Sequence, residues 1–194
     1  MLALWLTLSV LELAPVEPRK GGPSPGETVP DFKAQTVDRH SFSLADAVAS
    51  HKVVVFVFFS VSCPYSNLFA DHVGALSGQY RDRGVLFVGV NSNQGETPEE
   101  AAAYAREHAL RFPCLKDKGA RVAEILGAEV TPEAFLVDSK GRLRYRGQVR
   151  SRKGKPYLEE ALREVLADRP VRTPSAPAFG CPIDPDRGPA DGQE

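Results

Sequence analysis

The sequence of 194 residues contains only three cysteines, which excludes the simplest cysteine-based architectures. Three thiols are too few for a disulfide scaffold, and their spacings fit no zinc motif. The pattern Cys-x-x-Cys is missing, and the four histidines show no metal-ligand spacing. We therefore expect no metal and no cofactor. An odd number of cysteines also means that at least one thiol stays free or joins a second molecule.

An excess of charge of either sign is also missing. Lys and Arg total 24 against 25 for Asp and Glu, which gives a formal net charge of -1. This balance offers no general electrostatic attraction to nucleic acid or to an anionic membrane surface, so neither is expected as a partner. The hydrophobic share of 42% is nevertheless sufficient for a sizeable core.

No apolar run in the sequence is long enough to span a bilayer comfortably. Residues 2–11 come nearest, with eight apolar residues out of ten. This length suits the core of a signal peptide, although the positively charged front end is missing. We expect residues 1–23 to form a hydrophobic segment followed by a linker. We slightly favour export over a cytoplasmic chain with a buried or membrane-touching arm.

Residues 24–169 show the alternation of apolar runs and amphipathic stretches that predicts an α/β domain. The runs VVVFVFF at 53–59 and VLFVGV at 85–90 are typical of strands buried on both faces. Between them, apolar residues of the stretch 65–80 fall on one helical face, so a βαβ unit is expected. A short hairpin is expected before this unit, over residues 31–42.

The second half of the chain predicts a third buried strand, its hairpin partner and a last helix. These elements are expected at residues 134–138, 143–149 and 156–166. Thr97-Pro98, with Glu100 three residues after the threonine, predicts the start of another helix. Residues 170–194 are dense in Pro, Ala, Gly and Asp, and we expect them to form a flexible tail.

One cysteine stands where the first buried strand gives way to its helix, in the motif Cys63-Pro64-Tyr65-Ser66. The free amides and the dipole of a helix N-terminus stabilise a thiolate, and Pro64 suits a first helical turn because it has no N–H. Ser66, one turn later, is expected to donate a hydrogen bond to the sulfur. We therefore predict a reactive thiol at Cys63, against the alternative of an inert cysteine at a helix start.

With these elements in this order, the chain resembles the thioredoxin superfamily. Within it, the chain is similar to the redoxin and peroxiredoxin-like branch, related to alkyl hydroperoxide reductase and thiol-specific antioxidant proteins. The likeness covers residues 24–183 and rests on GETVPDF at 26–32, FSVSCP at 59–64, VNSN at 90–93, VTPEAFLVD at 130–138 and FGCPI at 179–183. It implies a thioredoxin-like fold: a central mixed sheet, helices on both faces and an N-terminal hairpin extension. It also implies a cis-proline at Thr131-Pro132, facing Cys63.

The chain departs from two well-known patterns of this superfamily. Ser66 stands where thioredoxins have their second cysteine, and Phe56 stands where peroxiredoxins have a proline. Ser60 fills the place of the Thr or Ser that precedes the peroxidatic cysteine by three residues. The resemblance thus implies a catalytic set made of Cys63, Ser60, Ser66, Thr131 and Pro132.

A Cys-x-x-Ser site cannot close a disulfide on itself, so a second thiol must complete any cycle. Cys181 lies about thirteen residues beyond the last expected helix, and an extended Pro-rich segment of that length reaches about 40 Å. Cys181 is therefore a candidate resolving cysteine, with a passive tail thiol as the equal alternative. Cys114 is a second candidate, but its apolar setting is more typical of a core residue.

Three functions fit this pattern. The first is a peroxiredoxin-like thiol peroxidase, in which Cys63 reacts with a peroxide and a second thiol resolves the sulfenic acid. The second is a thiol–disulfide oxidoreductase that acts through mixed disulfides, with Pro132 positioning the partner's backbone. The third is a non-catalytic binding module, whose Cys63 would have an ordinary thiol pKa. We take the peroxidase as the leading prediction. The expected substrate is a peroxide or a protein or low-molecular-weight disulfide, and the expected reductant is a thioredoxin-like or glutathione-like thiol.

Overall fold

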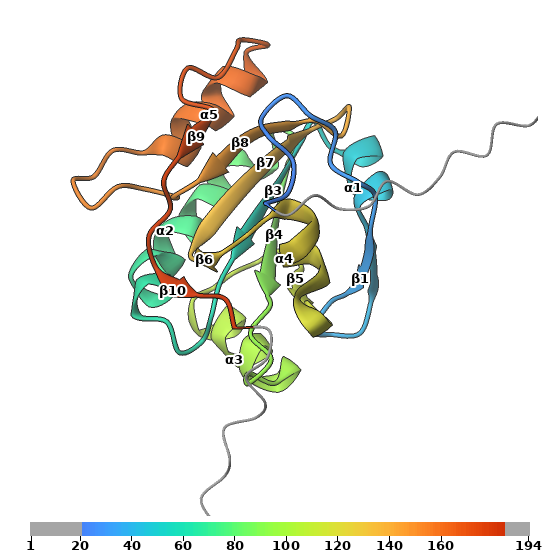
Figure 1. Ribbon diagram of the computed structural model, residues 1–194, viewed down its shortest axis with the longest axis vertical. Helices are drawn as coiled ribbons and strands as arrows, with labels where there is room; N and C mark the ends of the chain where they lie inside the picture. Colours follow the sequence, from blue (N-terminus) through green and yellow to red (C-terminus); the bar gives the residue numbers. More distant parts are fainter. Residues whose placement is uncertain (1–20, 185–194) are drawn as a thin grey trace, which may run out of the picture.

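A computed structural model describes residues 21–184, which form a mixed sheet with helices on both faces (Figure 1). The six strands of this sheet lie in the order β5-β4-β3-β7-β8-β9. Strands β3, β4 and β5 are parallel, and β7 runs antiparallel to β3 and β8. The strands are β1 (Lys33–Gln35), β2 (Ser41–Ser43), β3 (Val53–Phe58), β4 (Val85–Asn91), β5 (Cys114–Lys116), β6 (Val130–Thr131), β7 (Glu133–Asp138), β8 (Leu143–Gly147), β9 (Ser175–Ala176) and β10 (Cys181–Pro182). The helices are α1 (Leu44–Ser50), α2 (Pro64–Arg81), α3 (Pro98–Glu107), α4 (Arg121–Leu126) and α5 (Tyr157–Leu166), with a 3-10 turn η1 (Lys118–Ala120) before α4.

Strand β3 is the centre of two cores. All of its side chains are buried, as expected for a strand that is covered on both faces. Because successive side chains of a strand point to opposite faces, its odd-numbered valines pack with α2 and α5. Its even-numbered residues pack with α1, α4 and the segment that precedes α1. One hydrophobic run therefore fixes helices on both sides of the sheet.

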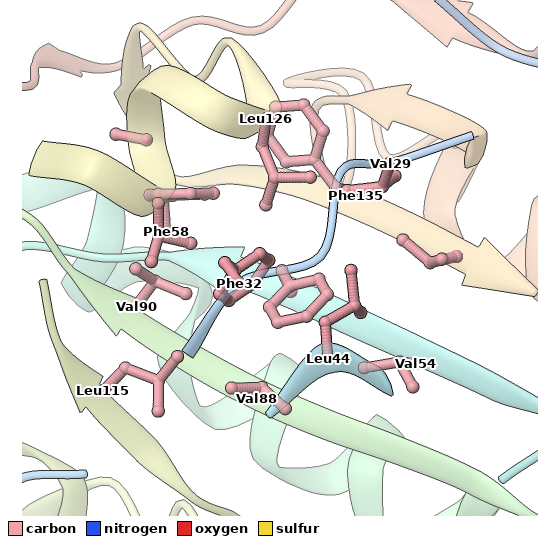
Figure 2. Close-up of a cluster of buried hydrophobic side chains, with 14 of the residues drawn as sticks. Val29, Phe32, Leu44, Val54, Phe58, Val88, Val90, Leu115, Leu126 and Phe135 are labelled. Atoms are coloured by element: carbon pink, nitrogen blue, oxygen red, sulfur yellow. The ribbon is translucent and has the colours of Figure 1, made fainter. Parts of the chain in front are cut away.

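Figure 2 shows the cluster on the α1 and α4 face. Val29 and Phe32, from the N-terminal segment, lie over the sheet close to Phe58 and Phe135. The rings of Phe58 and Phe135 meet edge to face with centroids 5.5 Å apart. Full burial of one such side chain stabilises the fold by about 1.5–3 kcal/mol, so the N-terminal segment is an integral part of this core.

The predicted helix starts agree with the structure. Ser43 caps α1 by accepting the N–H of Asp46. Thr97 and Glu100 form a reciprocal capping box at α3, with Pro98 at the first helical position. Helix α2 begins at Pro64 directly after Cys63, which is its N-cap residue.

The predicted fold is confirmed, including the mixed sheet, the helices on both faces and the N-terminal hairpin β1–β2. The flexible tail is a wrong prediction for residues 170–184, which we name the C-terminal strap. Strand β9 joins the sheet beside β8, and β10 pairs with β6 (Figure 1). The strap is ordered because its backbone pairs closely with other strands, and composition does not reveal such pairing. At β9, for example, Ala176 lies so near Gly147 of β8 that a Cβ on Gly147 would be 1.9 Å from the carbonyl oxygen of Ala176.

The remaining terminal predictions fall outside the described residues. The structure does not describe residues 1–20, which contain the apolar stretch and its candidate export signal. It also does not describe residues 185–194, the end of the expected tail. Within residues 21–184, no helix combines the length and the apolar character that crossing a membrane requires.

Candidate active site

Cys63 lies at the junction that the sequence predicted, between the end of β3 and the start of α2. Its backbone is extended, and its carbonyl accepts the N–H of Asn67 in the first turn of the helix. The side chain is only 1% exposed. Cys63 is therefore fixed at a helix N-terminus but is covered by other parts of the chain.

The Thr131-Pro132 turn faces this sulfur. The peptide bond between the two residues is cis, as the resemblance implied. The Cys63 thiol donates to the carbonyl oxygen of Thr131 at 3.1 Å. Two segments separated by 68 residues thus meet at one atom pair. The structure brings Cys63, Thr131 and Pro132 into one site.

The C-terminal strap covers Cys63. In the β10–β6 pairing, Cys181 lies opposite Thr131, and Pro182 lies opposite Val130. The Thr131 hydroxyl donates to the carbonyl oxygen of Cys181 at 3.4 Å. Cys181 is half-buried, and like Cys63 it is a free thiol. The structure therefore places the candidate resolving cysteine beside the candidate nucleophile.

The Thr131 carbonyl accepts from the protonated Cys63 thiol, but the other polar groups around the sulfur favour its ionised form. Burial alone would raise the pKa of this thiol, but hydrogen bonding from the Cys181 thiol and the Thr131 side chain has the opposite effect. The backbone amides of Ser66 and Cys181 act in the same direction, and the net result lowers the pKa from 9.0 to about 7. A large share of Cys63 is therefore thiolate at neutral pH, as a nucleophile requires.

Of the two thiols Cys63 and Cys181, Cys181 is the one that keeps its proton at neutral pH. Burial raises its pKa, and the hydrogen bond and the negative charge of Cys63 raise it further, to about 11. The backbone amide of Tyr65 has a smaller, opposite effect. At neutral pH, Cys63 is consequently the better nucleophile of the two, and Cys181 donates a hydrogen bond to it.

The two serines of the expected catalytic set do not act as predicted. Ser66 interacts with the Cys63 sulfur through its backbone amide, while its hydroxyl accepts the N–H of Ser60 at 3.2 Å. The expected donation from the Ser66 hydroxyl to the sulfur is corrected accordingly. The Ser60 hydroxyl donates to a carboxylate oxygen of Glu96 at 2.6 Å. Both hydroxyls therefore hold the turn before Cys63.

Glu96 organises this turn, although no local feature of the sequence singles it out. Its carboxylate accepts the backbone N–H groups of Val61 and Ser62, each at 3.0 Å. It also accepts the Ser62 hydroxyl at 2.9 Å and the side-chain amide of Asn91 at 2.5 Å. Because β3 and β4 are parallel, the loop after β4 lies near the loop after β3, and this topology is the signal that could have found Glu96.

Cys114 lies away from this cluster, in the hydrophobic core. It is 3% exposed on β5, and its cluster includes Phe59, Ala70 and Tyr104. Burial raises its pKa to about 12, with a smaller contribution from the charge of Asp38. A neutral, enclosed thiol of this kind is a poor candidate for a resolving cysteine.

Among the described residues, no three His, Cys, Asp or Glu side chains gather in a way that could hold a metal ion.

Comparisons with known proteins agree with this geometry. Residues 24–162 match the family described as Redoxin. The Thiol-disulfide oxidoreductase ResA of Halalkalibacterium halodurans is 26% identical over 118 residues, which are 61% of this chain and 65% of the relative, just under two thirds of its length.

Solved structures show the same fold. A hypothetical protein of Sinorhizobium meliloti 1021 superposes with a TM-score of 0.76 at 30% identity, covering 84% of this chain and 94% of that protein. A putative Thiol:disulfide interchange protein DsbE of Chlorobium tepidum gives a TM-score of 0.65 at 20% identity, covering 74% and 98%. The expected redoxin-type, thioredoxin-like architecture is thus confirmed.

Proposed function

Because the chain belongs to the Redoxin family, we propose that it is a thiol–disulfide oxidoreductase that reacts through Cys63. One observation carries the proposal. A buried sulfur whose pKa is lowered to about 7 lies 3.1 Å from the carbonyl of Thr131, beside a cis-proline. That arrangement provides a nucleophile and, next to it, the short strand β6, whose edge at Thr131 already pairs with an extended segment, β10.

The reaction follows from sulfur chemistry. The Cys63 thiolate attacks one sulfur of a substrate disulfide, a Cys63–substrate disulfide forms, and the other substrate sulfur leaves as a thiolate. The edge of β6 at Thr131, with Pro132 next to it, positions the substrate backbone. Since Ser66 replaces the second thiol of a Cys-x-x-Cys motif, another thiol must resolve the intermediate. The substrate class is a protein or low-molecular-weight disulfide, and the reductant is an external thiol.

Two observations favour exchange over the peroxidase that we took as the leading prediction. Relatives such as the Halalkalibacterium protein are named as thiol-disulfide oxidoreductases. In addition, Ser60 stands at the position of the peroxiredoxin Thr or Ser, but its hydroxyl is bound to Glu96 rather than to Cys63. The non-catalytic module is also less favoured, since it requires an ordinary thiol pKa at Cys63 and the pKa is lowered.

The test uses the full-length protein and a chromogenic aromatic disulfide, which releases a coloured thiolate on exchange. Wild type and Cys114→Ala should release this thiolate at similar rates, and Cys63→Ala should release it no faster than the remaining exposed thiols allow. A parallel assay with hydrogen peroxide should show consumption close to that of free cysteine. Cys63-independent exchange would refute the proposal, and fast Cys63-dependent peroxide consumption would restore the peroxidase.

A further inference from the structure

The C-terminal strap occupies the edge at which the proposed function seats a substrate. Strand β10 pairs antiparallel with β6, and Cys181 lies opposite Thr131. The Thr131 carbonyl that receives the Cys63 thiol belongs to this same pair. A disulfide substrate that pairs with β6 would place its reactive sulfur where Cys181 now lies.

Aromatic contacts anchor the strap over the start of α2. The ring of Phe179 meets those of Tyr65 and Phe69 edge to face, with centroids 5.5 Å and 6.3 Å away. The guanidinium of Arg152 lies over both Phe179 and Tyr65, 4.7 Å and 5.5 Å from the ring centres. These contacts hold residue 179 two positions before Cys181, so they fix the direction in which the strap enters the site.

Hydrogen bonds donated by backbone N–H groups hold the other end of the strap. The N–H of Ile183 donates to the carbonyl of Glu129 at 2.9 Å, and the N–H of Asp184 donates to the side-chain oxygen of Asn93 at 3.1 Å. Asn93 lies in the loop after β4 that also contains Glu96. The strap is therefore fastened on both sides of Cys181.

Gly180 permits the closest approach of the strap to β6. A Cβ at this position would lie 1.9 Å from the carbonyl oxygen of Thr131, which no side chain can tolerate. Only glycine allows the strap backbone to pass at this distance, and the next residue is Cys181. The sequence Gly-Cys thus combines a close contact with the Thr131 edge and a thiol beside Cys63.

We infer that residues 179–183 are an internal substrate of the Cys63 site, and that Cys181 is its resolving thiol. The inference rests on the proposed function and adds the second thiol and its regulation. The strap leaves β6 to admit a substrate disulfide, and Cys63 forms the mixed disulfide. On its return, the Cys181 thiolate attacks the Cys63 sulfur, which forms the Cys63–Cys181 disulfide and releases the substrate sulfur as a thiolate. The substrate gains two electrons, and an external dithiol later reduces the internal disulfide.

The charge of the pair supports this order of events. The negative charge of Cys63 is one cause of the raised pKa of Cys181. Once Cys63 is bonded to a substrate sulfur, this charge is absent, so Cys181 loses its proton more easily than in the resting protein. The resolving thiol is thereby activated after the first step rather than before it.

The closed strap also limits the access of substrates. Cys63 is 1% exposed, and a site that is open for only a fraction of the time binds more weakly in proportion to that fraction. Gly180→Ala should force the strap, together with Cys181, away from β6, and it changes none of the three cysteines in the sequence. Gly78→Ala is the matched control, because Gly78 is exposed on α2 and its added Cβ would meet nothing within 4 Å.

The first experiment maps the products after reaction of the full-length chain with equimolar glutathione disulfide, by acid quenching, alkylation and peptide mass spectrometry. Wild type should yield the Cys63–Cys181 disulfide, and Cys181→Ser should accumulate glutathione on Cys63. A persistent glutathione adduct on Cys63 in wild type would overturn the inference and leave the proposed function intact. No product at Cys63 in either protein would refute the proposed function itself.

The second experiment measures the alkylation of Cys63 by iodoacetamide in the reduced proteins at about pH 10, where Cys63 is ionised whether or not the strap donates to it. Gly180→Ala should react roughly tenfold faster than wild type because the open fraction rises, and it should form less internal disulfide. Gly78→Ala should match wild type in both measurements. Equal rates in wild type and Gly180→Ala, with circular dichroism showing both proteins folded, would overturn the role of the strap as a gate.

Discussion

Cys63 and Cys114 have nearly the same exposure but opposite chemistry. They are 1% and 3% exposed, yet the pKa of Cys63 is lowered to about 7 and that of Cys114 is raised to about 12. Burial acts on both in the same direction, since it disfavours the charged form. The difference between them therefore has two sources: Cys114 lies deeper in the protein, and more polar groups surround the Cys63 sulfur.

The surroundings of the two thiols explain the contrast. Cys63 stands at the N-terminus of α2, with the Cys181 thiol, the Thr131 side chain and the Ser66 amide directed at its sulfur. Cys114 is held within a sheet and packs against aromatic rings such as that of Phe59. Low exposure alone thus says little about reactivity, because the depth of burial and the hydrogen-bond donors decide it together.

The largest expected effect is on catalysis, where the two cysteines should differ most. Cys63→Ala removes the nucleophile and should lower the rate of disulfide exchange by about a thousandfold or more. Cys114→Ala removes a core sulfur that contacts no reacting atom and should keep the rate within about twofold of wild type at equal folded fraction. Rates measured with the chromogenic disulfide compare the two variants. A similar loss of exchange rate in both variants would contradict the assignment of Cys63, rather than Cys114, as the nucleophile.

The pH dependence of stability provides a second test. The Cys63 pKa is 9.0 without the folded environment and about 7 within it, so between these values the unfolded chain binds more protons than the folded one. The free energy of unfolding should therefore rise with pH in this window by roughly 2–3 kcal/mol, and this gain should be lost as pH falls through 7.

Urea unfolding of wild type and Cys63→Ala at several pH values isolates this contribution. The stability difference between the two proteins should grow from neutral pH to pH 9.0. Above that value, the raised pKa values of Cys181 and Cys114 should begin to destabilise the folded state, because the unfolded chain then releases these protons first. A difference that stays constant with pH would mean that the Cys63 pKa is unshifted.

Glu96→Gln should weaken the polar surroundings of Cys63 and leave those of Cys114 intact. Both oxygens of the Glu96 carboxylate accept hydrogen bonds, including those from the N–H groups of Val61 and Ser62. In the glutamine variant, an NH2 group replaces one of these oxygens and cannot accept, so it would lie against a donor without forming a hydrogen bond. The loss should cost about 2 kcal/mol, or roughly 4–8 °C in Tm, and should slow exchange. Glu107→Gln, at an exposed position near the end of α3, is the control and should change Tm by no more than about 2 °C. Equal melting temperatures for both variants would contradict the role of Glu96.

The smallest expected effect is a rise in the pKa of Cys63 towards the raised value of Cys114. Cys181→Ala removes a donor to the Cys63 sulfur and should raise its pKa, so that the thiolate fraction at neutral pH falls by roughly threefold to tenfold. Cys181→Ser keeps a hydroxyl donor and should change the pKa less. The pH midpoint of Cys63 alkylation in each variant measures the shift. An unchanged midpoint in Cys181→Ala would show that the strap does not tune the nucleophile.

Local sequence signals predicted most of the fold. The runs that became β3 and β4, the apolar face of α2 and the caps at Ser43 and Thr97 depend on neighbours along the chain. The junction at Cys63 and the turn at Thr131-Pro132 could be placed in the same way. The pairing of these two segments came from the resemblance to a known fold.

The strap and Glu96 could not be predicted from local signals. Strands β9 and β10 have two residues each, which is too short for any periodicity, and the Pro-rich composition favoured a tail. Their order depends on backbone pairing and on the close approach of Gly180, which exist only after the sheet has formed. Glu96 lies 36 residues after Ser60, so its role appears only when the two loops meet.

The ultraviolet absorbance of the thiolate, followed as a function of pH in the reduced full-length protein, tests the central claim most directly. The account predicts a titration step with a midpoint near 7 that disappears in Cys63→Ala and persists in Cys114→Ala. A wild-type curve without a step below the ordinary thiol value of 9.0 would contradict it, because Cys63 would then be protonated at neutral pH.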